Sequence, residues 1–223
     1  MAKRQCDPTS GSIGLQTYQQ GRNGQTVRTR AIPVNPRTSA QRAARAALTV
    51  AAQAWRTLTD AGRAAWEATA SAVKSRPRLA QYGMLTGEQL FCRINASLQA
   101  IGADTVTTVP DLPSFPKIPI TGLVITNVGG VAALKLTAPS APQDGTMCRV
   151  SKPVSQGIMR APRLALVGIL PSPVGGSCDI TSLYTAKYGN PPAGRRVFVS
   201  VNNNIDGWED LPLVFSAVVP ASS

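Results

Sequence analysis

The side chains of this chain that could do chemistry are acids and cysteines, because it contains no histidine. Ser-His-Asp and Cys-His catalysis, histidine zinc ligands and the usual general base near neutral pH are therefore absent. The closest acids, Asp206, Glu209 and Asp210, lie in and after a turn-like Asn-Asn-Asn-Ile-Asp-Gly stretch at 202–207. Their spacing fits neither a glycosidase carboxyl pair nor an EF-hand loop, although a looser calcium site stays open. We predict a non-enzymatic protein with no cofactor and no metal.

The four cysteines are far apart in the sequence, with no CxxC pair and no zinc-ligand spacing. We interpret them as free, partly buried thiols. A disulfide or a reactive thiol remains the alternative, because an even count permits pairing in an oxidising environment. They are Cys6, Cys92, Cys148 and Cys178.

Glycines dominate the first segment that could form regular structure, residues 12–32. The Gly21-Arg22-Asn23-Gly24 stretch tolerates positive φ and is flanked by β-compatible residues, which predicts a hairpin or an extended arm. The glycines match no phosphate-binding or dinucleotide-binding fingerprint. Because the segment has few large apolar residues, it should need support from another surface.

Positive charge is concentrated in the first part of the chain. The 223 residues carry a net charge of +12, and residues 1–80 hold 13 Lys and Arg against three Asp and Glu. Such a balance favours negative partners, either nucleic acid or acidic faces of other subunits. Arginine suits bidentate pairing across an interface, although a GC-rich genome would also favour its codons. The predicted partner-binding residues are Arg22, Arg28, Arg30 and Arg37 on the arm, with Arg42 and Arg45 on the first helix.

Three helices are predicted after the Pro-Val-Asn-Pro break at 33–36. Capping-box spacing starts the first at Thr38 and the third at Thr86, and Thr59-Asp60 can cap the second. In the third helix, Phe91, Ile94, Leu98 and Ile101 share one face, and Gly102 ends it. The apolar stripe of the first helix is Ala44, Leu48, Ala51, Trp55 and Leu58, and that of the second is Trp66, Ala70 and Val73.

The character of the sequence changes after residue 103. Four prolines between 104 and 120 disfavour helix and central strand, which predicts a linker. Beyond it, short β-rich runs alternate with turn residues and suggest an antiparallel sandwich of immunoglobulin or fibronectin type, with a helical or turn insertion at 179–188. The predicted strands are 123–126, 131–137, 147–150, 163–170, 195–201 and 213–219.

The predicted class is therefore α+β with several domains. Residues 1–36 form a basic arm or hairpin, 37–103 a helical domain, 104–120 a proline-rich linker and 121–223 a β-sandwich domain. The start of the chain lacks the apolar run of a secretory signal, and no stretch reaches the roughly 18 apolar residues that span a bilayer. We expect synthesis in the cytosol and no membrane partner.

Two resemblances bear on function. The Trp55–Asp60 stretch with Arg63 and Trp66 resembles the helix-two to helix-three junction of an HMG box, which implies minor-groove DNA binding. The competing interpretation is that both tryptophans only lock the helices together.

The second resemblance covers most of the chain. Residues 34–42, with an Asn-Pro-Arg-Thr-x-x-Gln helix start, and 58–66, with a Leu-Thr-Asp-x-x-Arg-x-Ala-Trp pattern, resemble a group of phage and prophage proteins. So do Gly87–Phe91 with Asn95, Pro153–Gly157 and Tyr184–Gly189. This resemblance implies a virion structural component without assigned catalytic residues.

The function expected from the sequence is a structural subunit of a bacteriophage virion. It would be a capsid-associated minor or decoration protein, or a neck or tail component, that contacts other virion subunits and forms a homo-oligomer. The alternative is a nucleic-acid-binding architectural protein that uses the basic helical pair. A carbohydrate-binding β domain is a third hypothesis and depends on Trp208, beside the Asn/Asp turn.

Overall fold

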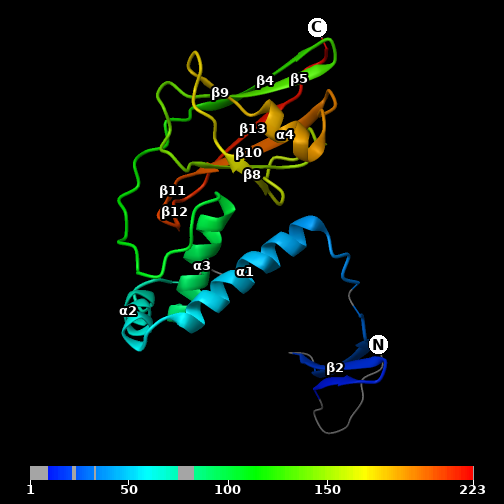
Figure 1. The fold of residues 1–223 in the computed structure, drawn as a ribbon. Helices are drawn as coiled ribbons and strands as arrows, with labels where there is room; N and C mark the ends of the chain where they lie inside the picture. Colours follow the sequence, from blue (N-terminus) through cyan, green and yellow to red (C-terminus); the bar gives the residue numbers. More distant parts are fainter. Residues whose placement is uncertain (1–9, 22–23, 33, 75–82, 223) are drawn as a thin grey trace. The chain divides into compact units, whose positions relative to one another are not determined.

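The computed structural model describes residues 10–21, 24–32, 34–74 and 83–222, which form a mixed α+β protein (Figure 1). The chain divides into two compact units, Met1–Arg42 and Ala43–Ser223. This division lies inside the first helix, a few residues after the arm boundary predicted at 36. The second unit contains the other helices, the proline-rich segment and the β strands together.

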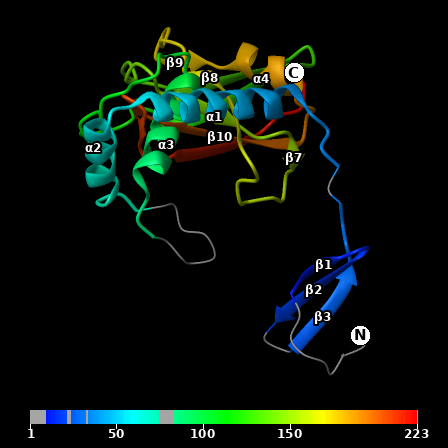
Figure 2. The same cartoon turned by 60° about the horizontal axis from the view of Figure 1, so that its bottom comes forward.

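The first unit contains a three-stranded antiparallel sheet, β1 (Gly11–Ile13), β2 (Gln16–Gly21) and β3 (Gly24–Thr29), in that order (Figure 2). Gly21 pairs with Gly24, so the predicted hairpin is confirmed, while Arg22 and Asn23 of its loop lie outside the described residues. None of the residues in 10–42 whose side chains are described is buried. This sheet therefore has no core of its own.

The two faces of this sheet differ in character. Tyr18 pairs with Val27, and Ile13 pairs with Gln16, two residues before Tyr18, so these three apolar side chains share a face. Arg28 pairs with Thr17 and belongs to the opposite face. Ile13 is 71% exposed and Val27 is also exposed. One face of the sheet thus carries three apolar side chains among glutamine and threonine side chains.

Helices α1 (Ser39–Thr57), α2 (Asp60–Ala70) and α3 (Gly87–Ala100) begin where the capping signals predict. The Thr38 hydroxyl accepts from Gln41 N at 3.3 Å, and the Gln41 side chain accepts from Thr38 N at 3.3 Å. Thr86 forms the same capping box with Gln89, and the Thr59 side chain accepts from Gly62 N. Local hydrogen bonding therefore sets all three starts.

The helices pack around Phe91 of α3. The ring centroids of Trp66 and Phe91 are 5.1 Å apart in an edge-on arrangement, and those of Trp55 and Phe91 are 5.5 Å apart. Only part of the apolar stripe predicted for α1 joins this core: Ala51 is buried, whereas Leu48 is 55% exposed. The two tryptophans therefore lock the helices together through α3, and the first half of α1 stays uncovered.

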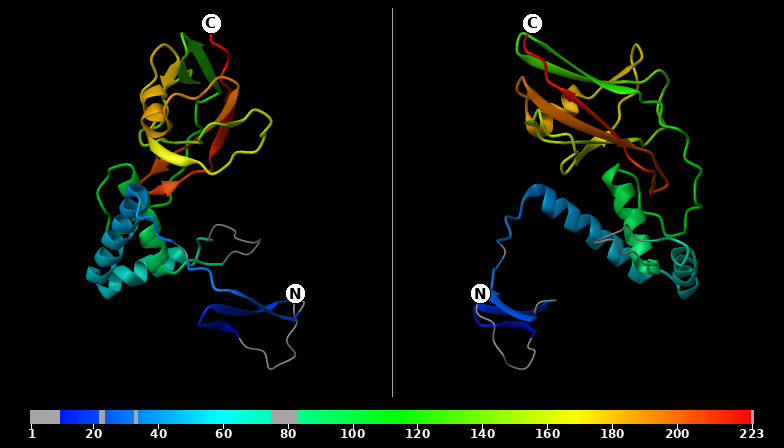
Figure 3. Two further views of the ribbon diagram at one scale, coloured as in Figure 1. Left: turned by 90° about the vertical axis from the view of Figure 1, so that its right-hand side faces the viewer. Right: turned by 180° about the vertical axis from the view of Figure 1, so that it is seen from behind.

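The β part contains two larger antiparallel sheets, which share one apolar core, and the two-stranded sheet of β11 and β12 (Figure 3). One of the larger sheets has the order β4-β5-β9, and the other the order β13-β10-β6-β8, with the two-residue β7 also pairing with β10. The six strands predicted from the sequence are confirmed within a few residues, and helix α4 (Thr181–Tyr188) lies in the predicted insertion. The bounds are β4 Gly122–Val128, β5 Val131–Thr137, β6 Met147–Val150, β7 Val154–Ser155, β8 Ala165–Ile169, β9 Ser177–Asp179, β10 Arg195–Asn202, β11 Asn204–Ile205, β12 Trp208–Glu209 and β13 Leu213–Val218.

The proline-rich segment at 104–120 contains no helix or strand, as predicted, but it is packed against the rest of the second unit. Phe115 packs against the helical core, and Ile118 and Ile120 are buried in the core of the sheets. Four side chains also bond to its backbone. Asn95 bonds to Val106 at N and O, Trp66 Nε1 donates to Thr107 O, Trp208 Nε1 to Pro110 O and Asn203 Nδ2 to Pro116 O.

No helix in the described part of the chain combines the length and the apolar character that crossing a bilayer requires.

Gly207 shows how closely the helices approach the β part. Its φ is +85°, and a Cβ placed there would lie 2.5 Å from Cγ2 and 2.8 Å from the carbonyl oxygen of Ile94 in α3. No side chain fits without moving the backbone of α3 or of the turn.

We therefore expect Gly207→Ala to lower the free energy of unfolding by about 2–4 kcal/mol, since it combines a positive φ with a backbone clash. Gly129→Ala is the matched control: its φ is +59°, but nothing lies within 4 Å of the added carbon. It should cost about 1 kcal/mol. Denaturant unfolding of both variants measures the difference, and equal losses would contradict the close approach.

Candidate functional site

Helix α3 lies beside the hairpin of β11 and β12 (Figure 1), and several buried polar side chains lie at this junction. Trp208 of β12 belongs to the helical core, although it is far from the helices in sequence. A side chain from the β part therefore completes the core of the helices. This makes the junction the first candidate for a functional site.

Three consecutive asparagines, Asn202, Asn203 and Asn204, are buried at the junction. A buried amide is costly unless hydrogen bonds satisfy it. The Asn204 amide donates to Ser97 at Oγ (3.1 Å) and at O (3.2 Å), and its oxygen accepts from Gly207 N at 3.0 Å. Asn203 Oδ1 accepts from the Thr146 hydroxyl at 3.0 Å. These amides connect α3, the turn and the sheet.

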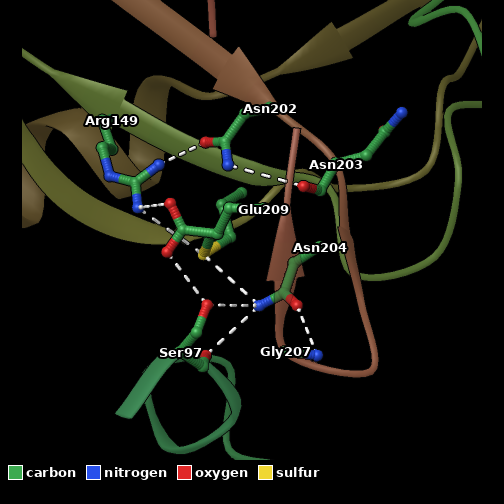
Figure 4. A network of polar contacts seen from close by, with 8 residues as sticks. Ser97, Arg149, Asn202, Asn203, Asn204, Gly207 and Glu209 are labelled. Carbon is green, nitrogen blue, oxygen red and sulfur yellow. Dashed lines mark hydrogen bonds and ion pairs between the residues drawn. The ribbon is translucent and has the colours of Figure 1, made fainter. Parts of the chain in front are cut away.

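An ion pair continues the contacts of these amides (Figure 4). Arg149 Nη2 of β6 lies 3.2 Å from Glu209 Oε2 of β12, and Nη1 donates to Asn202 Oδ1. The Ser97 hydroxyl donates to Glu209 Oε1 at 2.9 Å. We call Ser97, Arg149, Asn202, Asn204 and Glu209 the polar network. It satisfies a partly buried carboxylate and a partly buried guanidinium at the same time.

The acids identified in the sequence have separate roles. Asp206 (φ +50°) and Gly207 form the two-residue loop between β11 and β12, with the dihedrals of a type I′ turn. Glu209 belongs to the polar network, and Asp210 Oδ1 accepts from Leu211 N at 2.6 Å. Within the described ranges, no three His, Cys, Asp or Glu side chains form a cluster that could hold a metal ion.

A pocket of about 470 Å³ lies beside the polar network. Its charged lining combines two arginines, Arg93 and Arg149, with two acids, Glu209 and Asp210. Arg149 and Glu209 form an ion pair, so each neutralises the charge that the other presents to the pocket. The remaining lining residues are Leu164, Ser200, Asn202, Leu211 and Pro212.

The arginines predicted to bind partners are all exposed where the structure describes them, and Arg22 lies outside the described residues. Arg28 lies in β3, and Arg30 directly follows it, its N donating to Leu15 O at 2.7 Å. Arg37 has a positive φ of 47° before α1. Arg42 and Arg45 lie one turn apart on α1. Arg28, Arg30, Arg37 and Arg42 belong to the first unit and Arg45 to the second.

The described cysteines are free thiols. Cys148 and Cys178 are fully buried between the two sheets, and Cys92 in α3 is partly exposed. Burial, with a smaller contribution from Cys178, raises the pKa of Cys148 to about 12. Burial also raises the pKa of Cys92 and of Cys178. Cys6 lies outside the described residues.

Two other groups with shifted pKa values, Asp179 and Tyr184, lie at α4. The side chain and N–H of Thr181 bond to Asp179 and lower the pKa of that carboxyl, with Thr181 N at 2.8 Å from Oδ1. Burial raises the pKa of Tyr184, and Tyr188 adds to the rise.

Comparison with protein-family models, with curated proteins and with solved structures finds no match to this chain.

Sequence reasoning missed the polar network. Ser97 looks like an ordinary helix residue, and Arg149 lies inside a short strand. The available signal was the run of three asparagines before an Asp-Gly turn, because such amides are often used for side-chain to backbone bonds.

Glu209→Gln tests the polar network. The amide can still accept from Ser97, but Arg149 loses its carboxylate, so we expect the free energy of unfolding to fall by about 1–3 kcal/mol. Asp60→Asn removes an ion pair with Arg63 on a fully exposed side chain and should cause little change. Chemical denaturation compares the two, and similar effects would show that the network does not stabilise the junction.

Thiol labelling tests the burial between the sheets. In native protein at mildly alkaline pH, iodoacetamide should modify Cys92 well before Cys148 and Cys178, because the raised pKa of Cys148 keeps it protonated and both core thiols are inaccessible. In denaturant the three should react at similar rates. Peptide mass spectrometry gives the order, and native labelling of Cys148 as fast as Cys92 would refute it.

Proposed function

We propose that the chain is a non-enzymatic structural subunit of a bacteriophage virion, placed on the capsid as a minor or decoration protein or else in the neck or tail. The observation that carries the proposal is the β1-β2-β3 sheet: one face carries the apolar side chains of Ile13, Tyr18 and Val27, and no described side chain of the sheet is buried. The resemblance of the sequence to phage and prophage proteins supports the same assignment.

Energetics make such a sheet dependent on a partner. Fixing a residue costs roughly 1–2 kcal/mol in backbone entropy, and a small isolated sheet recovers little of this by burial. A neighbouring subunit that covers Ile13, Tyr18 and Val27 would provide the missing burial, while Arg28 on the other face would pair with acidic groups. An assembly subunit needs both properties.

We also propose that the two sheets form a sandwich of the immunoglobulin or fibronectin type. Numbering the longer strands in chain order puts the first, second and fifth (β4, β5, β9) in one sheet. The third, fourth, sixth and seventh (β6, β8, β10, β13) belong to the other. This order supports the assignment, because immunoglobulin-type sandwiches place strands A, B and E opposite C, F and G, with C′ beside C.

Nucleic-acid binding is the second candidate, and the exposed first half of α1 with Arg42 and Arg45 favours it. Against an HMG-type wedge, Trp55 and Trp66 are both engaged with Phe91. Binding through several phosphates would weaken steeply with added salt, whereas docking through an apolar face would be much less sensitive.

Particle incorporation tests the structural role. The double variant Ile13→Thr and Val27→Thr keeps β-branched residues in the sheet but removes apolar contact, so we expect about tenfold or fewer copies per purified particle. Val174→Thr makes the same change at an exposed valine of the second unit and should incorporate normally. Quantitative mass spectrometry of particles counts the copies.

Two outcomes separate the parts of the proposal. Absence of the wild-type chain from purified particles would overturn the virion role. Normal incorporation of the double variant would leave the virion role standing and would overturn docking through the apolar face.

A further inference from the structure

A second basic surface lies on the β part, where β7 pairs with the start of β10. Arg195 and Arg196 of β10 pair with Ser155 and Val154, so their side chains leave opposite faces of the strand, and they reach the end of β7 and the loop that follows it through hydrogen bonds to Ser155 Oγ and Gln156 O. The loop that follows β7 projects from the sheets (Figures 2 and 3). Lys152 and Arg163 lie two positions beyond Val150 and Ala165, the last pair of β6 with β8, so both belong to the segment that leaves this end of the ladder. The five basic residues are Lys152, Arg160, Arg163, Arg195 and Arg196.

The charge of this surface is not neutralised within the described residues. No Asp or Glu occurs from 145 to 178, and none of the five basic side chains pairs with a described carboxylate. Arg196 instead donates to Gln156 O at 3.0 Å and to Ser216 Oγ at 3.4 Å, and Arg195 donates to Ser155 Oγ at 3.4 Å. These neutral acceptors hold two guanidiniums in place without cancelling their charge.

An apolar pair lies within the same loop. Met159 is 76% exposed and Ile158 is 41% exposed, immediately before Arg160. Arginine and methionine are enriched in protein interfaces, whereas lysine is depleted, and four of the five basic residues here are arginines. The surface therefore combines fixed positive charge with an apolar anchor.

We propose that this surface binds an acidic protein surface that has an apolar recess for Ile158 and Met159. Charge complementarity disfavours a second copy of the same surface as the partner, since its five basic residues would face five like charges. A single-stranded nucleic acid is disfavoured because residues 151–164 contain no aromatic side chain on which a base could stack. The inference concerns the β part alone and does not depend on a virion role.

Defined probes test this proposal with the full-length protein. Two glutamate-rich peptides, identical except for central leucines in one and serines in the other, are compared with duplex DNA at physiological ionic strength by fluorescence anisotropy. We expect the leucine peptide to bind most tightly. Arg160→Glu should weaken both peptides about tenfold, and Met159→Ser should weaken only the leucine peptide.

Lys117→Glu is the matched control, because it makes the same charge change at an exposed lysine outside the surface. Its effect on peptide binding should be small. Equal weakening by Arg160→Glu and Lys117→Glu would reduce the attraction to net charge and overturn the proposal. Failure of the leucine peptide to bind, or tighter binding of duplex DNA, would also overturn it. Unchanged unfolding temperatures of the variants exclude misfolding as the cause.

Discussion

The contact between the β11–β12 turn and α3 is the constraint on which the second unit depends. A Cβ at position 207 would clash with Ile94, and both Asp206 and Gly207 have positive φ. The turn can therefore lie against α3 only with glycine at this position. That position brings Asn204 and Glu209 to Ser97 and inserts Trp208 into the helical core. Three short helices alone would enclose a small core, and the β part completes it. Helices and sheets therefore stabilise each other, which explains why they cluster into one compact unit.

The first unit has the opposite character. Its backbone hydrogen bonds are formed between strands, yet none of its described side chains is buried. The second unit, in contrast, contains two apolar cores. Under the proposed role in an assembly, the surface of a neighbouring subunit would supply the burial that the first unit lacks.

Local patterns in the sequence predicted much of the fold. The capping boxes at Thr38 and Thr86 join residues three apart in the sequence. Strand β5 has the bounds that its run of β-forming residues predicts. Both signals act over short distances along the chain. The polar network was not predictable in the same way. Ser97 and Asn204 are separated by 107 residues, so their hydrogen bond is set by tertiary packing. The exposure of the first half of the α1 stripe was not predicted. Hydrophobic periodicity identifies an apolar face of a helix but does not show whether another element covers it.

Native-state hydrogen exchange of the full-length protein tests most directly whether the first unit lacks stability of its own. We predict that amides of β2 and β3 exchange at close to unprotected rates, while those of β10 are protected up to global unfolding, because only β10 is backed by a buried core. Equal protection of β2, β3 and β10 in the isolated protein would contradict the account.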